Sequence, residues 1–116
     1  MNVQVLELLQ KRALVTRSAA RVLVASIAEI QATQEQGPLV LDFAGVEAAS
    51  PSFLDELLGR LRDSVQTNGA VRLVSTPGTL GGKLRAIGRG RGIAVQQEAE
   101  ADWRIEFPPE LSAPST

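Results

Sequence analysis

Apolar residues along the chain alternate between short continuous runs and a helical periodicity, which predicts strands and helices in turn. Leu39-Val40-Leu41 is a continuous apolar run, typical of a strand covered on both faces, and we expect a strand over residues 39–43. Further on, apolar residues recur at the spacing of one helical face: Leu54, Leu57, Leu58, Leu61 and Val65. This pattern predicts a helix over residues 51–66, with Ser50 as its N-cap and Pro51 at its first position.

Similar patterns predict the elements on the N-terminal side. Residues 3–8 mix alternation with a pair of leucines, so strand and helix are both open, and we favour a strand. A second short strand is expected at residues 13–15. A helix is predicted from Arg17 to about Gln34, capped by Thr16 and ended by Gly37-Pro38.

On the C-terminal side, an Asn68-Gly69 turn leads into a predicted strand at residues 71–75. The following elements are a helix at residues 80–87 closed by Gly88, a strand at residues 93–95, and an edge strand in which Trp103, Ile105 and Phe107 alternate with polar residues. An unpaired apolar edge of this kind also predicts a strand-paired homodimer.

Together these elements predict an α/β fold in one small domain, with a mixed sheet of four or five strands and helices packed on it. Strand 39–43, helix 51–66 and strand 71–75 form a βαβ unit with a right-handed crossover. We assign residues 1–110 to the domain and residues 111–116 to a disordered tail.

Composition removes several classes of function. The chain has 116 residues and a net charge of −1, whereas nucleic-acid and membrane-surface binders usually carry a basic excess. Cysteine, histidine and tyrosine are absent, which argues against thiol catalysis, zinc sites and most acid–base sets, so we expect no enzyme activity and no cofactor. No apolar stretch approaches a membrane span, and a cytoplasmic protein that is not membrane-embedded is expected.

Charged residues near the predicted helix 51–66 are the first candidates for a site. Asp42 ends a strand, where it can contact a ligand or, as we favour, form the turn. Asp55 and Glu56 point about 100° apart on a helix, so a catalytic pair is disfavoured, and Glu56 suits an ion pair with Arg60. Arg17 can reach Asp42 or Asp55, or lie free in solvent.

A glycine- and arginine-rich segment over residues 78–92 is a second candidate. It matches neither a P-loop nor a dinucleotide fingerprint, because the required glycines and the hydroxyl after Lys83 are missing. Lys83, Arg85, Arg89 and Arg91 form a basic run that can touch phosphates or an acidic partner. With one Trp and three Phe in the chain, a base-stacking platform is improbable, and we expect no nucleic-acid binding.

The chain resembles the STAS family, the sulphate-transporter and anti-sigma-factor-antagonist domains, in which an aliphatic strand ends in Asp and a loop leads to a helix that begins with serines. Two blocks carry a closer resemblance to bacterial STAS-like domains of unknown function: Thr16-Arg17-Ser18-Ala19-Ala20, and Asp42-Phe43-Ala44-Gly45-Val46 followed by Ser50-Pro51-Ser52-Phe53-Leu54-Asp55-Glu56. The resemblance implies a STAS-like order of elements.

In the anti-sigma-factor antagonists that this chain is similar to, a partner kinase phosphorylates a serine at the start of the helix. Counting on from Asp42 as in that family places this serine at Ser52. A helix N-terminus favours phosphate, and phosphate beside Asp55 and Glu56 would make a strongly acidic face. An ordinary first-turn serine is the alternative.

The expected function is therefore a regulatory protein–protein interaction module that resembles an anti-sigma-factor antagonist. Ser52 is its candidate phospho-acceptor, Arg17, Asp42, Ser50, Asp55 and Glu56 are its candidate partner-binding residues, and the resemblance implies a kinase or anti-sigma-type ATPase as partner. Two alternatives are open: an accessory STAS subunit of a membrane transporter, and a small-ligand or nucleotide sensor that uses the loops of residues 78–92.

Overall fold

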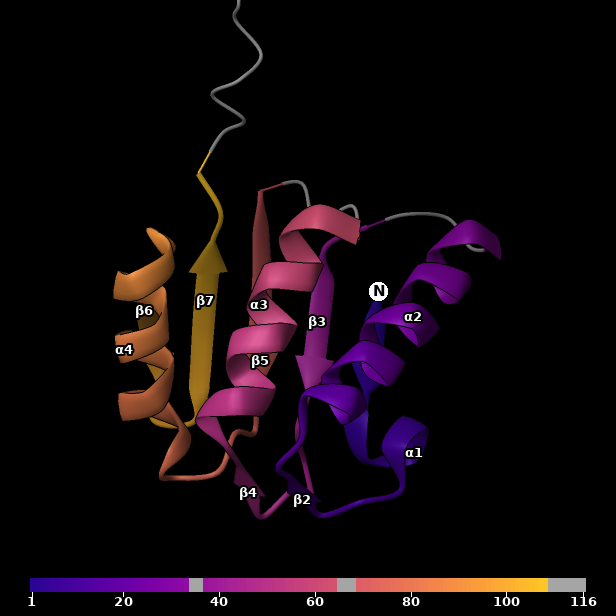
Figure 1. Ribbon diagram of the computed structural model, residues 1–116, viewed down its shortest axis with the longest axis horizontal. Helices are drawn as coiled ribbons and strands as arrows, with labels where there is room; N and C mark the ends of the chain where they lie inside the picture. The colour runs from indigo at the N-terminus through magenta and orange to yellow at the C-terminus, as the bar shows by residue number, and fades with distance from the viewer. Residues whose placement is uncertain (34–36, 65–68, 109–116) are drawn as a thin grey trace, which may run out of the picture.

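The computed structural model describes residues 1–33, 37–64 and 69–108, and Figure 1 shows their arrangement. Within these residues the helices are α1 (Val5–Leu9), α2 (Arg17–Thr33), α3 (Pro51–Ser64) and α4 (Leu80–Arg91). The strands are β1 (Asn2–Gln4), β2 (Ala13–Leu14), β3 (Leu39–Asp42), β4 (Ala48–Ala49), β5 (Ala70–Val74), β6 (Ala94–Ala99) and β7 (Asp102–Glu106).

Five strands form the main sheet in the order β1-β3-β5-β7-β6. β1, β3 and β5 run parallel, while β7 is antiparallel to both of its neighbours. This mixed five-stranded sheet with packed helices confirms the predicted α/β fold class. A separate parallel pair, β2 and β4, joins the segments that lead into α2 and α3.

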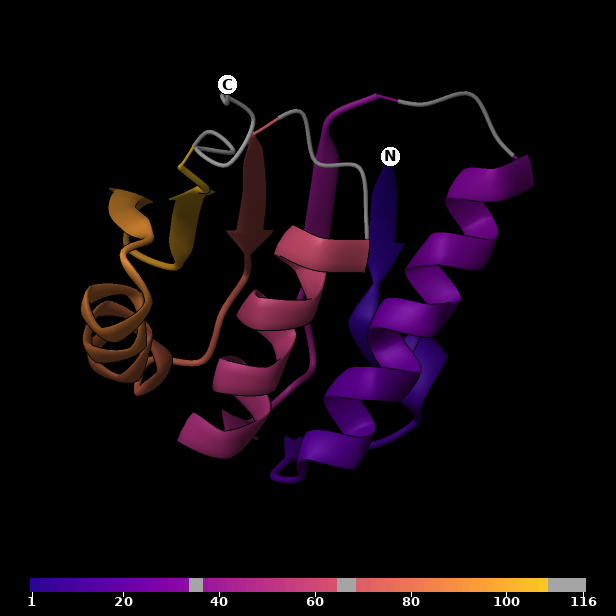
Figure 2. The ribbon, with the colours of Figure 1, turned by 45° about the horizontal axis from the view of Figure 1, so that its top comes forward.

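The larger helices that the structure describes cover one face of the sheet. Figures 1 and 2 show α2, α3 and α4 side by side on the same face of the sheet. The buried side chains of the strands alternate with half-buried or exposed ones, and the buried set comprises Val3, Leu39, Leu41, Val71, Leu73, Trp103 and Ile105. Val40 is half-buried and lies opposite Arg72, so the prediction that this strand is covered on both faces is wrong.

The N-terminal segment divides differently from the prediction. Residues 3–8 were expected to form one strand, but β1 ends at Gln4 and α1 takes over from Val5 to Leu9. Val5 is fully buried, and Gln10 ends this helix in the left-handed conformation, with its N–H bonded to the Leu6 carbonyl. The leucine pair, which favours a helix, outweighs the short alternation that precedes it.

β7 is an interior strand, and its predicted place at the edge of the sheet is wrong. It lies between β5 and β6, and Trp103, Ile105 and Phe107 are buried under the helices rather than exposed. The strand at residues 93–95 proves to be a longer edge strand, β6, which forms a hairpin with β7. The predicted homodimer therefore loses the exposed apolar edge on which it rested.

α4 continues past its predicted end. Gly88 lies within the helix, and Gly92 caps it with a φ of 69°. A Cβ atom at Gly81 would lie 2.4 Å from Cζ2 of Trp103, and one at Gly88 would lie 2.6 Å from Cγ2 of Val95. These glycines therefore allow α4 to pack closely on the sheet, and most of residues 78–92, which the alternative of a ligand sensor treats as loops, is helical. Gln34, Val65, Asn68 and the tail at residues 111–116 lie outside the described residues.

Candidate functional site

The start of α3 is fixed by hydrogen bonds to the segment before α2. The Ser50 N–H donates to the Leu14 carbonyl at 2.8 Å, which extends the β2–β4 pairing. The Ser50 hydroxyl donates to the Val15 carbonyl at 3.0 Å and accepts a hydrogen bond from the Phe53 N–H at 3.1 Å. The predicted N-cap is thus confirmed, and both hydrogen-bonding capacities of this hydroxyl serve the fold.

Ser52 is different from Ser50 although it lies in the same helical turn. Ser52 is exposed, and its hydroxyl has no hydrogen-bond partner among the described residues. It lies where the unpaired N–H groups of a helix favour negative charge. The geometry leaves this hydroxyl accessible for modification or recognition.

Asp42 shapes the loop after β3. Its Oδ1 accepts a hydrogen bond from the Ala44 N–H at 2.9 Å, and its Oδ2 accepts one from Nε2 of Gln4 at 3.2 Å. Phe43 and Val46 close the same turn through a backbone hydrogen bond of 2.9 Å. The favoured role of Asp42 as a turn-forming residue is confirmed.

Asp55 and Glu56 lie at the centre of what we call the arginine cluster, whose cations are Arg17, Arg21, Arg60 and Arg91. Arg17 donates to Asp55 at 2.9 Å and to Glu56 at 3.4 Å, so of its predicted carboxylate partners it reaches Asp55 rather than Asp42. Arg91 donates to the other oxygen of Asp55 at 2.8 Å. One carboxylate of α3 therefore links α2 to α4.

Glu56 binds the two remaining arginines of the cluster. Arg60, one turn along α3, donates to it as predicted, and Arg21 of α2 donates to the same oxygen at 3.1 Å. The Glu56 side chain is only 14% exposed. Neither Arg21 nor Arg91 was assigned to this site from the sequence, although Arg17 and Arg21 are one turn apart and must share a helix face.

Hydrogen bonds within the cluster change the acid–base properties of both carboxylates. Those from Arg60 and then Arg21 lower the pKa of Glu56 from 4.5 to about 2. Those from Arg91 and then Arg17 lower the pKa of Asp55, and in turn Asp55 raises the pKa of Arg17 and of Arg91. Both carboxylates are therefore ionised at neutral pH, which leaves no proton here for acid–base chemistry.

Cations from three helices set the charge of this surface. Four guanidinium groups surround two carboxylates, so the arginine cluster has a net charge of 4 − 2 = +2. From the sequence, a strongly acidic face is predicted only for the phosphorylated form, in which the charge on Ser52 joins Asp55 and Glu56. Helix packing instead brings cations from α2 and α4 against α3, which makes the face basic.

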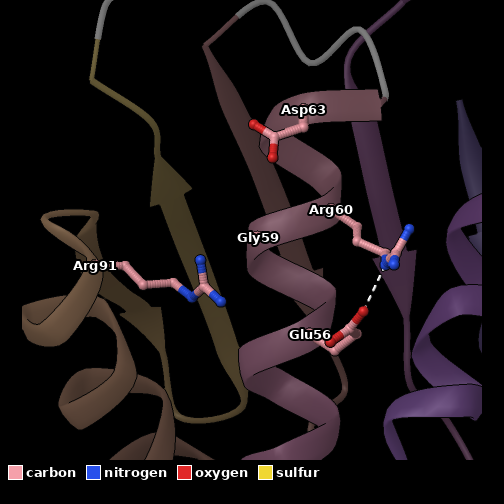
Figure 3. Close-up of a pocket in the computed structure, with 5 residues that line it drawn as sticks. All are labelled: Glu56, Gly59, Arg60, Asp63 and Arg91. Atoms are coloured by element: carbon pink, nitrogen blue, oxygen red, sulfur yellow. Dashed lines mark hydrogen bonds and ion pairs between the residues drawn. The ribbon is translucent and has the colours of Figure 1, made fainter.

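A shallow groove between α3 and α4 borders the cluster and is lined by Glu56, Gly59, Arg60, Asp63 and Arg91. Figure 3 shows Arg91 extending from α4 towards α3 at Gly59, while Arg60 turns to the other side of α3 and meets Glu56. A Cβ atom at Gly59 would lie 2.8 Å from Nη1 of Arg91. The absence of a side chain at Gly59 thus lets the Arg91 guanidinium lie against α3.

The predicted basic run of α4 separates into two flanks. Lys83 donates to the carbonyl of Ala49 in β4, just before α3, at 3.0 Å, and Arg91 binds Asp55 of α3. Arg85 and Arg89 are exposed on the flank beside β6, and neither forms an ion pair within the described residues. The guanidinium of Arg85 lies 5.1 Å from the centre of the Trp103 ring. The four cations therefore do not form one patch.

Comparison with known protein families gave a match over part of the chain. Residues 19–71 match the model of a family described as a STAS-like domain of unknown function. This segment runs from α2 through α3 to the start of β5 and includes Ser50, Ser52, Asp55 and Glu56. No curated protein and no solved structure matched the chain. In the part of the chain that the structure describes, every helix is too short or too polar to cross a membrane.

Proposed function

We propose that this STAS-like domain is a regulatory protein-recognition module and not an enzyme. Its partner would bind at the start of α3, and phosphorylation of Ser52 would control the binding. Within the described residues, the observation that carries this proposal is the contrast between two serines of one helical turn: Ser50 is engaged by the fold, whereas the Ser52 hydroxyl is exposed and has no partner.

The arginine cluster supplies a physical means for phosphate to act. Ser52 precedes Asp55 by three residues and Glu56 by four, so all three lie on neighbouring positions of the helix surface. A phosphate would add about 1.5–2 negative charges and three acceptor oxygens there. It would compete with Asp55 and Glu56 for Arg17, whose guanidinium they already share.

Such competition would alter the contact between α2 and α3, and would change the charge of the surface presented to a partner. The resemblance to anti-sigma-factor antagonists suggests that this partner is a kinase or an anti-sigma-type ATPase. Unphosphorylated and phosphorylated forms would then bind different proteins.

The test compares tagged wild-type protein with Ser52→Ala and Ser52→Asp variants in pull-downs from the cells of origin, with phosphate on Ser52 measured by mass spectrometry. Ser18 offers a matched control, because it is an exposed serine at the second position of α2, as Ser52 is of α3. We expect Ser52→Asp to exchange one captured protein for another, while Ser18→Asp captures the same proteins as wild type. Identical capture by all variants, together with unmodified Ser52, would contradict the switch.

A further inference from the structure

A free strand edge lies on the side of the molecule away from α2. Among the described residues, β6 is the last strand of the main sheet and pairs with β7 alone. Five of its six residues are exposed, and Val95 is half-buried. An edge strand presents unpaired backbone N–H and C=O groups along its outer side, so β6 offers a template for one more strand, regular from Ala94 to Gln97 and with a register shift between Gln97 and Ala99.

The edge is accompanied by cations. A groove along it is lined by Arg85, Arg89, Ile93, Ala94, Val95 and Gln96. Arg85 and Arg89 are one helical turn apart and repel one another, and no carboxylate of the described residues neutralises them. Two glutamates of the neighbouring strands are engaged elsewhere, because Glu98 pairs with Arg72 at 3.0 Å and Glu106 pairs with Arg104 at 2.7 Å.

Arg85 is held in place. Its guanidinium rests on the Trp103 ring at 5.1 Å, and Trp103 is itself fixed by close contact with Gly81 of the same helix. A cation ordered in this way loses less conformational entropy on binding an anion than a freely moving side chain. A role limited to keeping other strands away from the edge would not require this order.

We propose that β6 and α4 form a docking site for an extended, acidic segment of a partner protein. The segment would add a strand beside β6 through backbone hydrogen bonds, and its carboxylates would bind Arg85 and Arg89. The spacing is compatible: alternate residues of a strand are about 6.6 Å apart, and residues one turn apart on a helix have Cβ atoms about 5–6 Å apart. Acidic residues at alternate positions of the segment would therefore match the two arginines.

Charge argues against a second copy of this chain as the occupant. Two β6 strands paired about a twofold axis would bring two pairs of unneutralised arginines, Arg85 and Arg89 of each copy, to one seam. An acidic segment relieves the repulsion that a second copy would increase.

The test uses the whole chain labelled with ¹⁵N and a blocked eight-residue peptide of alternating glutamate and valine. One control peptide replaces glutamate by lysine, and another carries N-methyl groups on alternate backbone amides, which removes hydrogen-bond donors but keeps the charge. Amide shifts report the place of binding, and the titration gives the dissociation constant. The Arg85→Gln/Arg89→Gln double variant is compared with Arg62→Gln, which removes an arginine of α3 that lies outside the groove.

We expect the acidic peptide to shift the amides of Ala94–Ala99, and the double variant to bind it at least about tenfold more weakly while Arg62→Gln binds it as wild type does. Equal binding of the N-methylated peptide would overturn strand addition, because the groove would then bind anions only. Shifts that increase with protein concentration alone would identify a second copy as the occupant. Because this site is separate from Ser52, Ser52→Asp should leave the dissociation constant unchanged, so the two proposals stand or fall independently.

Discussion

The two flanks of α4 carry the same kind of residue and use it in opposite ways. Towards α3, Lys83 and Arg91 bind a backbone carbonyl and a carboxylate, and thereby fasten α4 to the rest of the helical layer. Towards β6, Arg85 rests on an aromatic ring and Arg89 is exposed to solvent. A cation on this helix is thus structural where another element presents an oxygen to it, and is available for binding where none does.

The start of α3 shows the same division between two serines. The Ser50 hydroxyl is used twice by the fold, whereas the Ser52 hydroxyl has no partner among the described residues. For the cations of α4 and for these two serines, residue type alone does not tell which side chains are bound by the fold and which are free to bind a partner. The contacts of each side chain decide, and three pairs of matched substitutions and one single substitution test this conclusion.

The largest effect is expected from Gly81→Ala. Its Cβ would be forced against Cζ2 of Trp103, a rigid ring that also supports Arg85, so we expect unfolding to become easier by about 1–3 kcal/mol. Gly82→Ala is the control, because a Cβ there meets nothing within 4 Å, and it should stabilise the helix by about 0.5–1 kcal/mol. Urea unfolding measures both, and changes of the same sign would contradict the close packing of α4.

The next largest effect on stability is expected from the two serines at the start of α3. Ser50→Ala removes the N-cap and the hydrogen bond to the Val15 carbonyl, which should cost about 1–2 kcal/mol of unfolding free energy. Ser52→Ala should change it by less than about 0.5 kcal/mol. Thermal unfolding of the two variants is sufficient to compare them. A comparable loss in Ser52→Ala would mean that its hydroxyl has a structural role after all.

A smaller effect distinguishes two arginines of α4. Arg91→Gln breaks the ion pair with Asp55 and should cost about 0.5–1 kcal/mol, because the pair is only partly exposed. Arg89→Gln should be neutral within about 0.5 kcal/mol. Carboxyl ¹³C titration provides a second measurement: the pKa of Asp55 should rise in Arg91→Gln and stay unchanged in Arg89→Gln. Equal shifts in both variants would show that general charge, not the specific contact, sets this pKa.

The last effect is a dependence of stability on pH. The folded protein holds the pKa of Glu56 at about 2, below its usual 4.5, so its ion pairs contribute fully above about pH 4.5. This contribution declines as the pH falls through that range towards 2, because protons then bind the unfolded chain more readily than the folded one. Stability measured by urea unfolding should therefore fall less steeply between pH 4.5 and 2 in Glu56→Gln. Parallel pH profiles would contradict the assignment.

Sequence patterns predicted the elements that depend on local periodicity. The apolar face of α3, its N-cap at Ser50 and the turn at Asp42 follow from spacing and side-chain chemistry within a few residues. The mixed sheet and the fold class were predicted from the order of these elements along the chain. The Arg60–Glu56 pair was predicted because both residues belong to one helix.

Features that depend on how distant segments pack were not predicted. The alternation around Trp103 and Ile105 predicted an exposed edge strand, because the residues near them in sequence do not indicate that β6 lies outside β7 in the sheet. For the same reason Arg91 was grouped with its neighbours in sequence rather than with Asp55, 36 residues away. The family match ends at residue 71, before α4, so resemblance could not supply this contact either.

The position of β7 also has a consequence for protein synthesis. β7 follows α4 and β6 in the chain, yet it fills the space between β5 and β6 and contributes the Trp103 ring on which α4 packs. On a ribosome, where N-terminal residues emerge first, β5 has an uncovered edge until residues 102–106 have left the exit tunnel. Completion of the sheet is thus delayed to a late stage of translation, and a nascent chain halted before Trp103 exposes a strand edge that the finished protein conceals.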